Sequence, residues 1–102
     1  MCRMFAHQPQ SNYESQTRSL RLGGHNTSIR LENTFWAILE EIAAFEGLSV
    51  GKFITTLHDE VLLHHGDVQN LASLLRCSCI LYVSNRKGRD TDKQVALLDA
   101  AQ

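Results

Sequence analysis

The chain contains one short stretch in which apolar and polar residues alternate, followed by two stretches with helical spacing. Along residues 27–31 the side chains of Ile29 and Leu31 fall on one face of a strand, and polar side chains fall on the other. Apolar residues then recur at helical spacing over 35–46 and again over 53–61. The pattern predicts a strand followed by two amphipathic helices.

A single strand leaves backbone donors and acceptors unpaired along its edges, and these groups need partners. We therefore expect a second copy of the chain to supply the partner strand. Antiparallel pairing of residues 26–31 would place Asn26 opposite Arg30 of the other chain, with a two-fold axis near Ser28. The result would be a homodimer with a two-stranded ribbon, a shape that can read DNA.

Residues that favour helix ends stand at the expected boundaries. The first helix can be capped by Glu32, Asn33 or Thr34, and Gly47 suits the position just after its last turn. Ser49 is then in place to cap the second helix. The two helices are therefore predicted to be joined by a short glycine-centred turn.

A third helix is predicted over residues 70–83, with Asn70 in position to cap it. It is apolar around most of its circumference after residue 77, so we expect it to be largely buried. Cys77 and Cys79 lie two residues apart and point in different directions on a helix. We expect both to be small buried hydrophobic residues rather than a redox pair or a metal site.

Residues 17–22 also alternate, and the turn-rich sequence Gly-Gly-His-Asn separates them from 27–31. Two interpretations remain open. In one, the two segments form a hairpin, and the four-stranded sheet of a dimer would not enter a major groove about 12 Å wide. In the other, residues 17–22 are a flexible arm whose Arg18 and Arg21 contact DNA phosphates.

Charge is distributed unevenly along a chain whose net charge is −1. Residues 1–31 carry four arginines against one glutamate, a net charge of +3, whereas residues 32–67 carry one lysine against seven acids. Residues 68–102 return to a net charge of +2. The distribution indicates a modestly basic strand region on an acidic helical body, which is compatible with nucleic acid as a partner.

No motif in the sequence indicates an enzyme, a cofactor or a metal centre. His58, His64 and His65 lack a clean i,i+4 or i,i+3 ligand pair, and we interpret His64 and His65 as exposed residues at a helix end. The 102 residues suggest one domain, and they contain no apolar run of 18 residues and no signal-peptide core. We therefore expect a cytoplasmic protein without a membrane span.

The chain resembles the ribbon-helix-helix family, the fold of the Arc-type repressors. The matching features are the strand 28–31, the helix 35–46 and the segment 47–54, Gly-Leu-Ser-Val-Gly-Lys-Phe-Ile. The longer stretch GGHNTSIRLENTFW, with NLASLLRC downstream, is similar to an uncharacterised bacterial subfamily. The resemblance implies a mainly α fold with a short β ribbon, forming a ribbon-helix-helix homodimer with an additional C-terminal helix.

The resemblance also implies a set of contact residues. In this family the outward strand residues enter the major groove, and the N-terminus of the second helix contacts the DNA backbone. The residues that would contact bases are Asn26, Ser28 and Arg30. The residues that would contact phosphate are Ser49, Val50 and Gly51, through their amides, together with Lys52. From the local sequence alone, Lys52 is equally well interpreted as an ordinary surface lysine.

We expect three regions: a loosely ordered segment over 1–16, a ribbon-helix-helix domain with a third helix over 17–83, and a polar C-terminal tail over 84–102. The leading functional interpretation is a DNA-binding homodimer that regulates transcription. The alternative is a dimeric protein-interaction module with the same fold, which a hairpin and the acidic helices would favour. The sequence names no operator, regulated gene or small-molecule effector.

Overall fold

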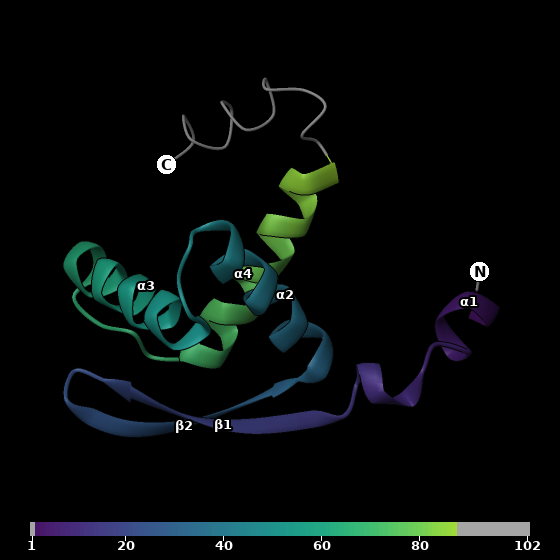
Figure 1. The fold of residues 1–102 in the computed structure, drawn as a ribbon, viewed down its shortest axis with the longest axis horizontal. Coiled ribbons are helices and arrows are strands. Elements are labelled where there is room, and N and C mark those ends of the chain that lie inside the picture. Colours follow the sequence, from purple (N-terminus) through teal and green to yellow (C-terminus); the bar gives the residue numbers. More distant parts are fainter. Residues whose placement is uncertain (1, 88–102) are drawn as a thin grey trace.

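Two paired strands and three longer helices make up most of the computed structural model, which describes residues 2–87 (Figure 1). The elements, in chain order, are α1 (Cys2–Ala6), the 3-10 helix η1 (Gln10–Asn12), β1 (Ser15–Leu22), β2 (His25–Glu32), α2 (Asn33–Phe45), α3 (Val50–His65) and α4 (Leu71–Lys87). The predicted mainly α fold with a short β ribbon is confirmed. Residues 88–102 of the predicted tail lie outside the described residues.

The two strands pair antiparallel within one chain. Ser15 lies opposite Glu32 at one end of the hairpin, and Leu22 lies opposite His25 at the other. The connecting Gly23 and Gly24 have φ angles of 57° and 83°, the positive values that a two-residue type I′ turn requires and that other residues adopt only under strain. The hairpin interpretation is therefore confirmed, and residues 17–22 are not a free arm.

All three long helices lie on the same side of the hairpin (Figure 1). α3 packs on β1, whereas α2 and α4 pack on β2. The strand side chains turned toward the helices include Leu22, Ile29 and Leu31, which are buried. Because burial alternates along both strands, the opposite face of the hairpin is left to solvent.

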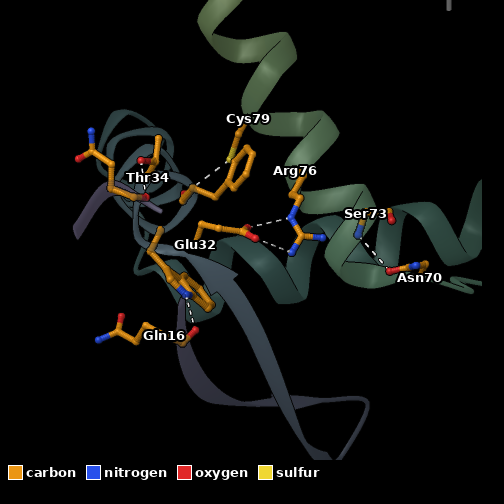
Figure 2. Close-up of polar contacts among 10 residues, drawn as sticks. Gln16, Glu32, Thr34, Asn70, Ser73, Arg76 and Cys79 are labelled. Carbon is orange, nitrogen blue, oxygen red and sulfur yellow. Dashed lines mark hydrogen bonds and ion pairs between the residues drawn. The ribbon is translucent and has the colours of Figure 1, made fainter. Parts of the chain in front are cut away.

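The hydrophobic core lies between the hairpin and the helices. Its fully buried side chains are Trp36, Leu31, Leu39, Ile54, Leu75 and Cys79. The indole N–H of Trp36 donates a hydrogen bond of 2.8 Å to the backbone oxygen of Gln16, which is labelled in Figure 2. This bond satisfies the polar group of a buried ring and ties β1 to α2.

Two of the predicted helix caps are confirmed. Ser49 Oγ accepts a hydrogen bond of 3.1 Å from the backbone N–H of Lys52. Asn70 Oδ1 accepts one of 3.1 Å from the backbone N–H of Ser73 (Figure 2). Gly47, just past the end of α2, has a φ angle of 72°, which is the left-handed conformation typical of this position. The starts of α3 and α4 thus follow from their local sequence.

The predicted cap of α2 is confirmed in its position but not in its hydrogen bonding. Glu32 occupies the N-cap position, but its side chain makes no capping hydrogen bond. Asn33 Nδ2 donates instead to the backbone oxygen of Ser11 at 3.0 Å. Thr34 Oγ1 donates in the same way to Asn12 at 2.7 Å. These side chains hold the segment before β1 against the start of α2 and are therefore not free to cap the helix.

The second half of α4 is less buried than expected. α4 continues past the predicted end at residue 83, and its C-terminal half extends away from the other helices (Figure 1). Ile80 and Leu81 are 59% and 40% exposed as a result. Cys79 is buried as predicted, but the prediction for Cys77 is wrong, because its side chain is exposed.

Candidate nucleic-acid interface

The face of the hairpin turned away from the helices is polar and exposed. The register brings its residues together in cross-strand pairs, which are Arg21 with Asn26, Ser19 with Ser28, and Thr17 with Arg30. We call these six residues the outer face. Residues 15–31 contain three arginines but no aspartate or glutamate. Such a surface can donate hydrogen bonds to phosphates or base edges without repulsion from a carboxylate.

The outer face contains all the residues that the resemblance implies for base contacts. Asn26, Ser28 and Arg30 follow one another along β2 and are all exposed. Neither Arg30 nor Arg21 forms an ion pair with any residue from 2 to 87. A free guanidinium fork can bind a phosphate or the edge of a guanine through two parallel hydrogen bonds.

Arg18 lies on the inner face of β1, away from Arg21. Its guanidinium stacks over the ring of Trp36 with 4.4 Å between the carbon Cζ and the ring centroid. The same group forms an ion pair of 3.5 Å with Glu40, and its Nε donates to Gln16 Oε1 at 2.9 Å. The phosphate contact expected of Arg18 assumed a flexible arm. In the hairpin, this side chain instead fastens β1 to α2, and we leave it out of the interface.

The start of α3 keeps part of the predicted anion site. The backbone N–H of Lys52 is already bonded to Ser49 Oγ, whereas the next two amides toward the helix start, those of Val50 and Gly51, meet no acceptor within the described chain. The Lys52 side chain is exposed. Two free amides beside an ammonium group, at the positive end of a helix dipole, could hold one phosphate.

Contacts with β1 set the position of this helix start. Thr55 Oγ1, one turn into α3, lies 2.9 Å from the backbone oxygen of Gly51 and 3.3 Å from that of Arg21, and its one proton is shared between them. Gly51 lies beside Leu20, whose Cδ2 is 3.9 Å from where a Cβ on Gly51 would be. The anion site is therefore held at the outer edge of β1, next to the outer face.

Replacing Lys52 with glutamate should weaken binding to all DNA sequences alike. Loss of one phosphate contact should lower the slope of log affinity against log salt by about one ion per subunit. The salt dependence can be measured by fluorescence anisotropy with several unrelated duplexes. Leu63→Glu, at the far end of α3 and 86% exposed, is the control and should leave the slope unchanged. An unaltered slope for Lys52→Glu would remove this residue from the contact surface.

Glu32 is the one acidic residue of β2, and its charge is neutralised by an ion pair with a residue of α4. Arg76 of α4 donates to both carboxylate oxygens, from Nε at 3.0 Å and from Nη2 at 3.4 Å (Figure 2). The guanidinium also lies over the ring of Phe35, 5.8 Å from its centroid. The hydrogen bond from Arg76 is the main cause that lowers the pKa of the Glu32 carboxyl below its ordinary value, so this group is ionised at neutral pH.

The histidines and cysteines do not form a reactive cluster in the described part of the chain. Within residues 2–87 no three side chains of His, Cys, Asp or Glu come close enough to hold a metal ion. Burial raises the pKa of the Cys79 thiol to about 11, so it remains protonated at neutral pH. No helix among these residues has both the length and the hydropathy needed to cross a membrane.

Sequence reasoning missed two parts of this surface. Thr17 and Ser19 extend the outer face onto β1, and the absence of acidic residues over 15–31 was a signal that could have indicated this. The pairing of Glu32 with Arg76 joins residues 44 positions apart, and no local pattern indicates it.

Comparison with known proteins identifies the family. The model of the ribbon-helix-helix domain matches residues 15–83, which include both strands and most of α4. The solved structure of an uncharacterized protein from Bordetella pertussis Tohama I is similar, with 46% identity and a TM-score of 0.83 over 87% of this chain and 72% of that chain. No curated protein matches. The match over most of the chain, together with the hairpin and the helices that follow it, means that this protein belongs to the ribbon-helix-helix domain family.

Proposed function

We propose that this protein is a sequence-specific DNA-binding homodimer that regulates transcription. The observation that carries the proposal is the outer face, in which exposed Arg21 and Arg30 stand among hydroxyl and amide side chains and no carboxylate is present. Proteins of this domain family are typically DNA-binding regulators, and the comparisons support the proposal at that level. A protein with this role would act in the cytoplasm of a bacterial cell.

The free edge of β2 supports dimerisation through the strands. Asn33 N–H donates to Glu14 O at 2.8 Å, which makes these two residues a hydrogen-bonded pair of the antiparallel ladder. Because hydrogen-bonded and non-hydrogen-bonded pairs alternate in such a ladder, every second residue of β2 counted from Asn33 bonds to β1. The backbone groups of Asn26, Ser28 and Arg30 fall between these pairs and point to the opposite edge. There they meet no partner among the described residues. A second β2 running antiparallel around Ser28 would satisfy them.

A hollow along α3 with a mixed lining of apolar and polar side chains is a second argument for a dimer. It has a volume of about 650 Å³ and is lined by Leu57, Glu60, Val61, His64 and His65. An adjoining hollow of about 260 Å³ shares Leu57 and Glu60 and adds Phe53 and Leu48. Leu57 points to the opposite side of α3 from Thr55, the residue that touches β1. A partner subunit would cover the apolar side chains of these hollows and enlarge the small core of the single chain.

The hairpin changes how such a dimer would meet DNA. Four strands at about 4.8 Å spacing put the outer two about 14 Å apart, which exceeds a major groove about 12 Å wide. The two β2 strands would therefore lie over the groove, and the β1 strands over the phosphate backbones on either side. At this depth a long side chain such as Arg30 can reach base edges, whereas Ser28 is too short. Arg21 on β1 would meet phosphate.

The four-stranded sheet of the dimer would be wider than the major groove, and this width favours a second candidate function, a dimeric protein-interaction module with no DNA role. The exposed Ile80 and Leu81 on α4 and the acidic helices would then be the surfaces to search for a partner. Selection from a random DNA library separates the two functions. The DNA-binding function requires enrichment of a defined sequence, and recovery of unselected sequences would favour the interaction module.

Replacing Ser28 with proline should prevent dimerisation and leave the hairpin within each chain intact. The Ser28 N–H points to the free edge, so its removal breaks no bond to β1 but obstructs pairing with a second β2. Sedimentation equilibrium should find the wild-type chain dimeric at micromolar concentration and the variant shifted toward monomer. Thr27→Pro is the matched control, because it removes a donor to β1 and should unfold the hairpin. A Ser28→Pro chain that dimerises as tightly as wild type would exclude this interface.

A further inference from the structure

Glu32 is the residue of β2 whose negative charge would most weaken phosphate binding at the outer face. Strand alternation assigns it to the same side as Ser28 and Arg30, and it lies next to the strand residues that would approach DNA. A carboxylate in that position would repel phosphates. In the structure its side chain is instead directed toward α4, where both oxygens accept hydrogen bonds from Arg76 (Figure 2).

Several contacts hold Arg76 in position for this role. Leu75, the residue before it, is fully buried and fixes this turn of α4 in the core. The guanidinium lies over the ring of Phe35 and meets Glu32 through two nitrogens. About a third of each charged side chain remains exposed, 35% for Arg76 and 34% for Glu32. The pair is thus fixed in orientation but close enough to solvent for its charge to be felt by a bound polyanion.

We propose that Arg76 is a positioning residue for DNA binding: it holds and neutralises the Glu32 carboxylate, so that phosphates approach an outer face without a negative charge. The proposal rests on the proposed DNA-binding function. It gives α4, which also contributes Leu75 and Cys79 to the core, a defined part in that function. Arg76 acts through Glu32 and does not itself contact DNA, because it lies on the side of the hairpin that carries the helices.

Three variants test this relation, each assayed by anisotropy against the selected duplex and a random-sequence duplex. Arg76→Gln should lower affinity for both duplexes about fivefold at low salt, with a smaller loss at high salt, because a freed carboxylate repels phosphates through screened charge. Glu32→Gln should bind as tightly as wild type or more tightly. The double variant Arg76→Gln with Glu32→Gln should recover the affinity lost in Arg76→Gln alone.

A pH titration of DNA affinity separates this role of Arg76 from a purely structural one, because loss of a structural contact would not be reversed by protonation of Glu32. Without the hydrogen bond from Arg76, which is the largest cause of its lowered pKa, the pKa of the Glu32 carboxyl should rise, although Arg30 on the same strand still favours the ionised form; protonation of Glu32 at acid pH should then restore binding. The affinity ratio between Arg76→Gln and the double variant should therefore approach one as pH falls. Each variant is first checked for helical content and sedimentation, and Arg76→Met, which also removes the charge and keeps an unbranched side chain, replaces Arg76→Gln if the latter does not fold.

Two results would overturn the inference. Equal weakness of Arg76→Gln and the double variant would mean that Arg76 acts through the fold or contacts phosphate directly. Full affinity in a folded Arg76→Gln protein would mean that Glu32 does not reach the DNA surface. Failure of the proposed function looks different, because the wild-type protein and all the variants would then fail to bind DNA.

Discussion

Replacing Arg30 with glutamine should remove the sequence preference of the protein and leave most of its general affinity for DNA. Arg30 is the long cationic side chain on β2, it is exposed on the outer face, and it forms no ion pair with the described residues. A guanidinium fork matches O6 and N7 of guanine, so its loss should cost about 1–3 kcal/mol at the preferred site and little elsewhere. The measurement is the ratio of affinities for the selected duplex and a random one.

Arg21→Gln is the matched control for this experiment. Arg21 is also exposed on the outer face, but it belongs to β1, which we expect to lie over the phosphate backbone. Its loss should weaken both duplexes equally and leave the affinity ratio unchanged. If Arg21→Gln changed the ratio and Arg30→Gln did not, the strands would be oriented on DNA in another way than proposed.

Replacing Ile29 with aspartate should abolish the folded state. Ile29 is only 5% exposed and packs in the cluster that contains Leu31, Leu39 and Ile54. A buried carboxylate without a partner costs several kcal/mol, roughly 4 or more, and domains of this size have a total stability of about 5–15 kcal/mol. Circular dichroism should show loss of helix, and sedimentation should show unfolded or aggregated chains.

Ser19→Asp introduces the same side chain on the opposite face of the hairpin. Ser19 is exposed, so this variant should keep the helical content and melting temperature of the wild type. It should also weaken DNA binding, since it adds a carboxylate to the outer face. An Ile29→Asp chain that folds as stably as Ser19→Asp would mean that the inner face of the hairpin does not form a packed core.

The secondary structure was largely predictable because its signals are local. Period-two alternation identified the inner and outer faces of β2, and 3.6-residue spacing identified the helices. The caps at Ser49 and Asn70 join groups three residues apart, so the sequence shows both partners at once. The same alternation assigned Asn26, Ser28 and Arg30 to one face before any tertiary contact was known.

The role of residues 17–22 depended on distant contacts. Their alternation and the Gly23–Gly24 turn are compatible with a hairpin, but a short hairpin is marginally stable alone, so local sequence left an arm equally open. In the folded chain, Trp36 bonds to Gln16, and Thr55 bonds to the backbone of Arg21. These contacts from α2 and α3 stabilise β1 as a strand. They also separate Arg18, on the inner face, from Arg21 on the outer one.

Local sequence was sufficient to establish the strand faces, the helices, two of the helix caps and the basic character of residues 1–31. Tertiary contacts were needed to establish which residues pair with the long charged side chains and how much of each helix is buried by neighbouring elements. Glu32 is a candidate cap in the sequence, but Arg76, 44 residues later, lies 3.0 Å from it, and Ile80 is exposed because no helix within residues 2–87 covers the end of α4. Periodicity reports the direction of a side chain from its own backbone, whereas burial and ion pairing depend on which other segment is brought alongside.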